Sequence, residues 1–203
     1  NTVIDALHWV IARIQSDKQR DARLCALLDQ ALTFDWKVCR FVLITGHRRE
    51  NFGDGVSQIC EAISTLAAKF SDIHFVYPMH MNPNIQKPVR KLLEGLPNIH
   101  LIEPLDYEPF VYLLKHSYIV LTDSGGIQEE APSLGKPVLV MRNVTERPEA
   151  VAAGTVELVG TNKSRIVDSV VRLVENAAHY AEMSRSHNPY GDGKACERIL
   201  SAL

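Results

Sequence analysis

Residues 118–130 read Tyr-Ile-Val-Leu-Thr-Asp-Ser-Gly-Gly-Ile-Gln-Glu-Glu, and this stretch decides the fold of the chain. An apolar β-branched run ends at Thr122, and Ser124-Gly125-Gly126 then opens a segment of helical composition. The order predicts a strand that runs into a helix N-terminus through a turn with almost no side chains. Exposed N–H groups and the positive end of the helix dipole make such a turn an anion site.

The residues of this turn and of the helix behind it suit a nucleotide sugar. Two glycines let a phosphate approach the backbone closely, and the hydroxyl of Ser124 adds a donor. Glu129 and Glu130 follow about one helical turn later, where a carboxylate can accept hydrogen bonds from a ribose diol. A glycine pair after a strand is also common as a simple tight turn, so the rest of the chain has to decide.

Strand-like and helix-like segments alternate along the chain. Short apolar runs predict buried strands at 39–45, 73–77, 99–102, 118–122, 137–141 and 155–159. Helical spacing is found at 55–70, 82–94, 107–116, 126–134, 145–152 and 162–176. This alternation predicts an α/β fold, a doubly wound and mostly parallel Rossmann-like sheet with helices on both faces. Ligands bind such sheets at the carboxyl ends of the strands.

The two ends of the chain have a different pattern. Helical segments without strands are found at 2–15, 18–32, 178–185 and 194–203. Helices that flank a Rossmann-like domain often bridge to a second domain, so we expect this role for a helical segment at 1–35 and for C-terminal helices at 178–203. Between them, a Rossmann-like domain that binds a nucleotide sugar is expected at 36–177.

Composition excludes several classes of protein. The 203 residues are 46% hydrophobic and 23% charged, which is ordinary for a globular protein. A formal net charge of −2 argues against nucleic-acid binding, which needs a basic face. No apolar run approaches the roughly 20 residues that span a bilayer, and no signal peptide is visible. The four cysteines are scattered without metal-binding spacing, which predicts reduced thiols in a cytoplasmic protein and no bound metal.

Polar segments follow the first two predicted strands. In Thr45-Gly46-His47-Arg48-Arg49-Glu50-Asn51, the imidazole suits acid–base chemistry and the guanidinium groups suit phosphates. His80 lies in Tyr77-Pro78-Met79-His80-Met81-Asn82-Pro83-Asn84, a loop pinned by two prolines. Neither segment is a Walker motif or a dinucleotide-binding glycine motif, so the ordinary ATP and NAD interpretations drop out. Spacing alone leaves a plain solvated loop open for both.

Two later segments also allow either a structural or a ligand-binding interpretation. Phe110 stands near the start of the helix after the third strand and can stack on a base, although such an aromatic is more often part of the core. After the fifth strand, Thr145-Glu146-Arg147-Pro148-Glu149 offers a charged cluster. A helix capped by Thr145 with Pro148 in its first turn explains part of that cluster structurally.

Taken together, these segments resemble the UDP-N-acetylglucosamine 2-epimerase family of the non-hydrolysing bacterial type. The matching segments are 46–51, 77–84, 122–130, 145–149 and Asn188-Pro189-Tyr190-Gly191-Asp192-Gly193. The resemblance covers nearly the whole chain, and its motifs are long and ordered. It implies a GT-B-like fold of two Rossmann-like domains, with a UDP-sugar in the cleft and this chain as the C-terminal half.

The resemblance also implies roles for single residues. For UDP binding these are Ser124, Gly125 and Gly126 at the diphosphate, Glu130 at the ribose and Phe110 at the uracil. His47 matches a histidine of the active site. Arg48 and His80 match positions that bind a second UDP-GlcNAc as an allosteric activator. Further candidate contacts to substrate or cleft are Arg49, Glu50 and Arg147.

The implied reaction inverts C2 of UDP-GlcNAc to give UDP-ManNAc, by elimination of UDP to a glycal and its re-addition after protonation of the opposite face. Neither a metal nor NAD is required, and UDP-GlcNAc and UDP are the expected ligands. In this family the acid–base carboxylates belong to the N-terminal domain, so we expect the isolated chain to be inactive. The intact protein is expected to be a homodimer in the bacterial cytoplasm that serves polysaccharide biosynthesis.

Three alternatives stay open at this point. The C-terminal half of a nucleotide-sugar glycosyltransferase has the same fold, glycine turn and ribose glutamate, although residues 46–51 and 145–149 favour the epimerase. The second is a UDP-sugar-binding module without catalysis. The third is the hydrolysing subtype, which releases free ManNAc and UDP, and Arg48 and His80 argue mildly against it.

Overall fold

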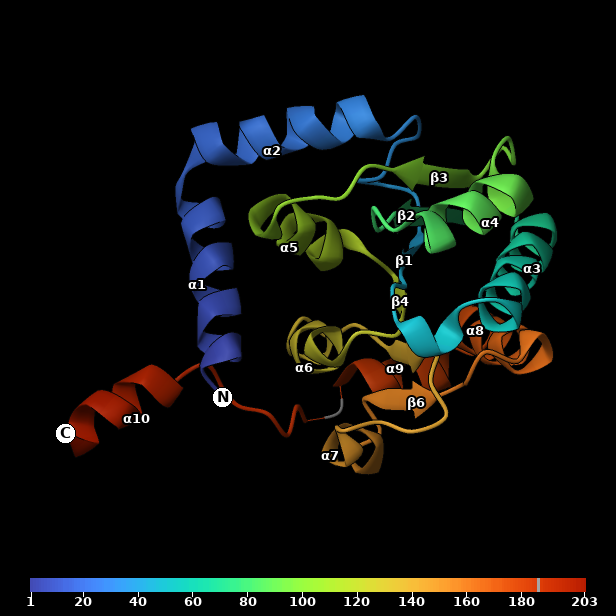
Figure 1. Ribbon diagram of the computed structural model, residues 1–203. Helices are drawn as coiled ribbons and strands as arrows, with labels where there is room; N and C mark the ends of the chain where they lie inside the picture. The colour runs from blue at the N-terminus through green and yellow to red at the C-terminus, as the bar shows by residue number, and fades with distance from the viewer. Residues whose placement is uncertain (186) are drawn as a thin grey trace.

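A six-stranded parallel sheet forms the centre of the computed structural model, which describes residues 1–185 and 187–203 (Figure 1). The strands are β1 (Phe41–Thr45), β2 (His74–Pro78), β3 (Ile99–Ile102), β4 (Ile119–Thr122), β5 (Val138–Val140) and β6 (Val156–Leu158). Their order is β3-β2-β1-β4-β5-β6, with each neighbouring pair parallel. The winding direction reverses between β1 and β4, the place where doubly wound sheets bind ligands. The Rossmann-like fold expected from the sequence is confirmed.

Helices cover both faces of this sheet. One layer contains α3 (Asp54–Lys69), α4 (Pro83–Leu93), α8 (Lys163–Glu175) and α9 (Ala177–Arg185). The opposite layer contains α1 (Thr2–Ser16), α2 (Lys18–Ala31), α5 (Tyr107–His116), α6 (Gly125–Ser133) and α7 (Pro148–Ala152). A short 3-10 helix, η1 (Arg49–Asn51), follows β1, and α10 (Ala195–Ala202) ends the chain.

The buried strands explain why the apolar runs are continuous rather than alternating. In β1, Val42 and Ile44 pack into the core under α3, whereas Phe41 and Leu43 pack into the core on the opposite face. All four side chains are fully buried. Since successive residues of a strand point to opposite faces, a sheet covered on both sides needs apolar residues at every position.

Both ends of the chain pack partly on this domain. Ile14 of α1 and Leu28 of α2 are buried in the core layer that contains α5 and α6. Tyr180 of α9 stacks on Tyr118 with ring centroids 4.3 Å apart. The three-part division at residues 35 and 177, and the packing of the last helices toward another domain, stay predictions.

The outer surface of α1 and most of α10 are open to solvent. Trp9 is 61% exposed and Leu200 is 74% exposed. Asp5 of α1 accepts hydrogen bonds from the N–H groups of Ala195 and Cys196 at 3.1 and 2.6 Å, so α1 holds the first turn of α10. Figure 1 shows α10 beside the start of α1, away from the sheet. Among the residues described, none of the helices is both long and apolar enough to cross a membrane.

Candidate functional site

A pocket of about 300 Å³ opens at the carboxyl edge of the sheet, over the ends of β1, β2 and β4. Four residues singled out in the sequence line it together, namely His47, His80, Phe110 and Ser124. The polar segments after different strands therefore meet at one place, as the parallel sheet requires.

One wall of this pocket is apolar. It is formed by Met79, Pro104, Leu105 and Phe110. Phe110 is half-buried and packs on the core as well as lining the pocket, so its core role is confirmed and its contact with a base stays a prediction. A flat apolar wall suits the face of a planar base.

The opposite end of the pocket is the corner at the start of α6. Gly125 and Gly126 have ordinary helical backbone as the first two residues of this helix. A Cβ on Gly125 would lie 3.8 Å from its nearest neighbour, Arg48 Nη2, and one on Gly126 would lie 3.9 Å from Ser124 Oγ. Glycine costs up to about 1 kcal/mol relative to alanine in a helix. Neither backbone nor packing calls for glycine here, so the open space at the corner is what the two glycines provide.

Arg48 adds a cation to the same corner. Its guanidinium lies beside Gly125, at the positive end of the α6 dipole. Among the side-chain atoms the structure describes, its buried Nε is one of those without a hydrogen-bond partner. Two positive groups side by side repel each other unless an anion lies between them. A phosphate at this corner would satisfy both.

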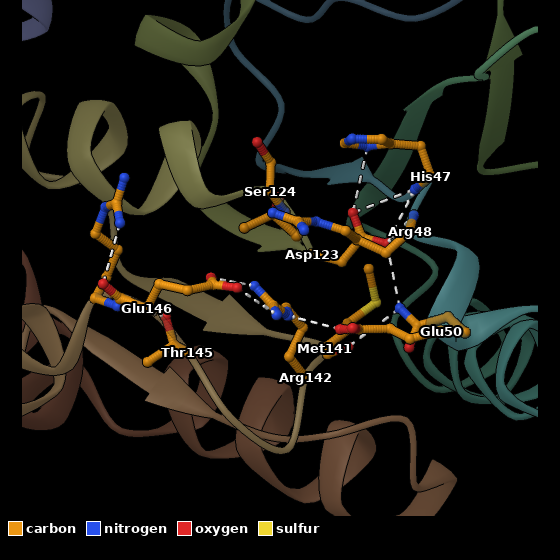
Figure 2. A network of polar contacts seen from close by, with 12 residues as sticks. His47, Arg48, Glu50, Asp123, Ser124, Met141, Arg142, Thr145 and Glu146 are labelled. Carbon is orange, nitrogen blue, oxygen red and sulfur yellow. Dashed lines mark hydrogen bonds and ion pairs between the residues drawn. The ribbon is translucent and has the colours of Figure 1, made fainter.

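A buried carboxylate, Asp123, connects the end of β4 to the loop after β1 (Figure 2). Its Oδ2 accepts hydrogen bonds from the backbone N–H groups of His47 at 3.0 Å and Arg48 at 2.9 Å. The side-chain amide of Asn51 donates to the same oxygen at 3.2 Å and to the carbonyl of Met141 at 3.3 Å. The loop is therefore fixed to the ends of β4 and β5.

Two histidines that the sequence assigned to different sites lie side by side. The rings of His47 and His80 stack with centroids 5.5 Å apart and planes 18° apart. Nδ1 of His80 accepts a hydrogen bond from the N–H of Asn82 at 3.2 Å, so that ring carries its proton on Nε2 when neutral. The imidazole of His47 is 43% exposed and lines the pocket.

Glu130, the predicted ribose contact, is buried on α6. Tyr107 donates a hydrogen bond from its hydroxyl to Glu130 Oε1 at 2.8 Å. Burial raises the pKa of Glu130, the hydrogen bond from Tyr107 opposes that rise, and the neighbouring Glu129 adds to it. Tyr107 did not stand out in the sequence, although its place at the start of α5 faces the same carboxylate.

The other candidate contacts differ in their surroundings. Arg147 forms an ion pair with the buried Glu129. Glu50 accepts a hydrogen bond from Arg142 Nε at 2.7 Å, and Arg142 also binds both carboxylate oxygens of Glu146, at 2.6 and 2.9 Å (Figure 2). Arg49 is exposed on η1. Arg142 holds the pKa of Glu146 down at about 2.

The helix expected at 145–152 begins only at Pro148, and Thr145 does not cap it. The residue before it, Arg147, has φ −128° and ψ 56°, since a residue that precedes proline is kept out of the helical region. The hydroxyl of Thr145 instead donates to Gln128 Oε1 at 2.6 Å and accepts from the N–H of Arg147 at 3.0 Å. The polar segment is thereby attached to α6.

The fold and the pocket together define a class of protein, the doubly wound Rossmann-like domains that have a ligand pocket at the topological switch point of the sheet. A family model described as UDP-N-acetylglucosamine 2-epimerase matches residues 1–203. The chain belongs to the UDP-N-acetylglucosamine 2-epimerase family, and the resemblance noted in the sequence is confirmed.

Curated relatives are similar over the full length of the chain. It is 56% identical to the UDP-N-acetylglucosamine 2-epimerase of Yersinia pestis, covering 100% of this chain and 53% of that protein. It is 55% identical to the enzyme of that name from Escherichia coli strain K12, with the same coverage. The chain thus spans about half the length of the curated relatives it matches.

Solved structures of this family have the same fold as the chain. The UDP-GlcNAc 2-epimerase of Neisseria meningitidis bound to UDP-GlcNAc superposes with a TM-score of 0.92 at 49% identity, over 100% of this chain and 53% of that one. The Methanocaldococcus jannaschii enzyme in complex with UDP-GlcNAc and UDP gives 0.79 at 30% identity, over 100% and 53%. The C-terminal domain of a group 1 glycosyl transferase from Francisella tularensis gives 0.60 at 17% identity, which shows a shared fold alone.

Proposed function

We propose that this chain binds the UDP part of UDP-N-acetylglucosamine and is one half of a 2-epimerase that interconverts UDP-GlcNAc and UDP-ManNAc. The observation that carries the proposal is the open glycine corner at the start of α6 with the guanidinium of Arg48 beside it. The relatives bound to UDP-GlcNAc and to UDP support the choice of ligand.

In this proposal the diphosphate lies at the α6 corner, between the backbone N–H groups and Arg48. The uracil lies against the apolar wall at Phe110, and the ribose hydroxyls bind the buried carboxylate of Glu130. Ser124 and Phe110 line the same pocket, whereas Glu130 lies one helical turn further along α6, outside the pocket lining, and is bonded to Tyr107.

The proposed chemistry follows from where charge develops. When the C1–O bond of the sugar breaks, negative charge grows on the departing diphosphate. Preorganised donors at the α6 N-terminus and a cationic His47 stabilise this charge more strongly than that of the bound substrate, which lowers the barrier. Removal and return of the proton at C2 need further acid–base groups. We assign these to the part of the relatives that this chain does not span, within a homodimeric cytoplasmic enzyme.

Calorimetric titration tests the binding. UDP should bind the chain, and uridine should bind at least about tenfold more weakly because the corner stays empty. Ser124→Ala should weaken UDP binding several-fold. Glu130→Gln should remove most of the difference between UDP and 2′-deoxy-UDP, whereas Glu103→Gln, a change at an exposed carboxylate, should leave it unchanged. Equal affinity of the parent and both site variants would show that UDP binds elsewhere.

Turnover is tested separately. Incubation of the chain with UDP-GlcNAc should give no UDP-ManNAc by proton NMR, because we assign the groups that act at C2 to the part of the relatives that this chain does not span. Detection of that product would overturn the assignment of the acid–base groups to another part of the enzyme, while the binding proposal would stand on the titration.

A further inference from the structure

The carboxylate of Asp123 makes more contacts than are needed to hold the loop after β1 in place. It is 1% exposed, and a charge buried to this extent is costly unless it is fully paired. An uncharged acceptor could receive the N–H groups of His47 and Arg48. The second oxygen, Oδ1, lies 3.4 Å from Nδ1 of the His47 imidazole (Figure 2). A buried negative charge is useful at this contact, because it can pair with the imidazole of His47 when that ring is protonated.

The contact determines which nitrogen of His47 carries the proton. A ring nitrogen that faces a carboxylate is protonated, and the other nitrogen is then the one available to a ligand. Here Nδ1 faces Asp123, so Nε2 is on the far side of the ring, and His47 lines the pocket together with Ser124. The stacked ring of His80 fixes the plane of the imidazole. The distance of 3.4 Å between Nδ1 and Oδ1 is that of an ion-pair contact when the ring is protonated, and it is long for a hydrogen bond.

We propose that Asp123 is a positioning residue that acts through His47. It holds the imidazole with its proton on Nδ1 and Nε2 toward the pocket. When Nε2 takes up a proton from solvent, the carboxylate stabilises the resulting imidazolium, whose Nε2–H donates a hydrogen bond to a phosphate oxygen of the ligand. This inference rests on the proposed function for the identity of the ligand. The tautomer that it assigns to His47 does not depend on any ligand.

The tautomer can be measured directly. Chain labelled with ¹⁵N-histidine is observed in long-range ¹H–¹⁵N spectra at a pH where imidazoles are neutral, and the signals are assigned with His47→Gln and His80→Gln. The parent should show His47 protonated on Nδ1. Asp123→Asn should shift His47 toward the Nε2-protonated form that free imidazole side chains favour. An Nε2-protonated His47 in the parent overturns the proposal, and this reading needs no variant of Asp123 to fold.

A double-mutant cycle on UDP affinity tests the functional part. Asp123→Asn should weaken UDP binding about tenfold in the parent and less than about twofold in a His47→Gln background, because its effect passes through the imidazole. Asn51→Ala also removes a hydrogen bond to Asp123 but does not touch the ring. Its cost should be the same in both backgrounds.

The outcomes separate the two proposals. An equal loss from Asp123→Asn in both backgrounds would mean that Asp123 only fixes the loop, which overturns the inference. Failure of the parent to bind UDP at all would contradict the proposed function. The tautomer of His47 would still decide whether Asp123 positions it.

Discussion

At the scale of single residues, Gly126 separates the demands of folding from those of binding. Because a Cβ there would make only an ordinary contact, 3.9 Å from Ser124 Oγ, Gly126→Ala should raise the free energy of unfolding by up to about 1 kcal/mol, while UDP affinity falls about tenfold or more. Thermal unfolding and titration with UDP check the two halves of this prediction.

The matched control for that substitution is Gly55, in the first turn of α3. A Cβ there would lie 3.5 Å from Thr161, an ordinary contact, so Gly55→Ala should also be tolerated and should leave UDP affinity unchanged. If Gly126→Ala kept full affinity, the corner would not be a phosphate site.

A pair of histidines near the amino ends of β2 and β3, away from the pocket, should make the stability of the fold sensitive to acid. His74 Nδ1 and His100 Nε2 lie 3.0 Å apart, and Phe34 stacks on His74 at 3.8 Å between ring centroids. Burial lowers the pKa of both histidines, and that of His100 falls to about 4, with the charge of His74 adding to the effect. The unfolded chain therefore binds more protons than the folded chain between pH 6.5 and 4.

Stability should fall as the pH drops through this window, by up to about 1.4 kcal/mol per pH unit for each proton taken up on unfolding. Urea unfolding at several pH values checks this. His100→Gln should flatten the dependence between pH 6.5 and 5, whereas His8→Gln, a change at an exposed histidine, should not. A slope that is the same in all three chains would rule the histidine pair out as its source.

At the scale of elements, Arg142 after β5 links the two polar loops of the site through Glu50 and Glu146. Arg142→Gln should release both loops from each other, because the exposed carboxylates become solvated instead of paired. Hydrogen exchange should speed up in residues 47–51 and 143–147 and stay constant in β1. As a control, Arg172→Gln breaks a surface pair with Glu157 and should change neither loop.

The elements themselves were largely predictable, because their signals are local. The six strands lie within two residues of the apolar runs that predicted them, since a strand covered on both faces has to be apolar throughout. The start of α7 could not be predicted in this way, because Thr145 bonds to Gln128, 17 positions away, instead of capping the helix. The pairing of Asp123 with His47 spans 76 positions. It depends on β1 and β4 being neighbours, a strand order that no local pattern reveals.

At the scale of the whole molecule, the exposed apolar side chains of Trp9 on α1 and Leu200 on α10 should matter only in a longer protein. Leu200→Glu should change the stability of this chain by less than about 0.5 kcal/mol, because the side chain is already 74% exposed. In a protein of the relatives' full length that carries this chain, we expect the same change to lower epimerase activity by disturbing contacts with the other half.

Val38→Glu provides the comparison, since Val38 is 79% exposed at the opposite edge of the sheet, before β1. It should leave both stability and activity unchanged. Should Leu200→Glu prove equally silent in the longer protein, the surface of α1 and α10 would have no part in joining the two halves.

The hydrogen bonds from the first turn of α10 to Asp5 also bring the last helix of the chain beside the first one. Domains whose termini are neighbours tolerate a change in the order of their segments. A circular permutant that joins Leu203 to Asn1 by a flexible linker, and opens the chain at the exposed turn of Gly95, would retain every strand pairing of the sheet.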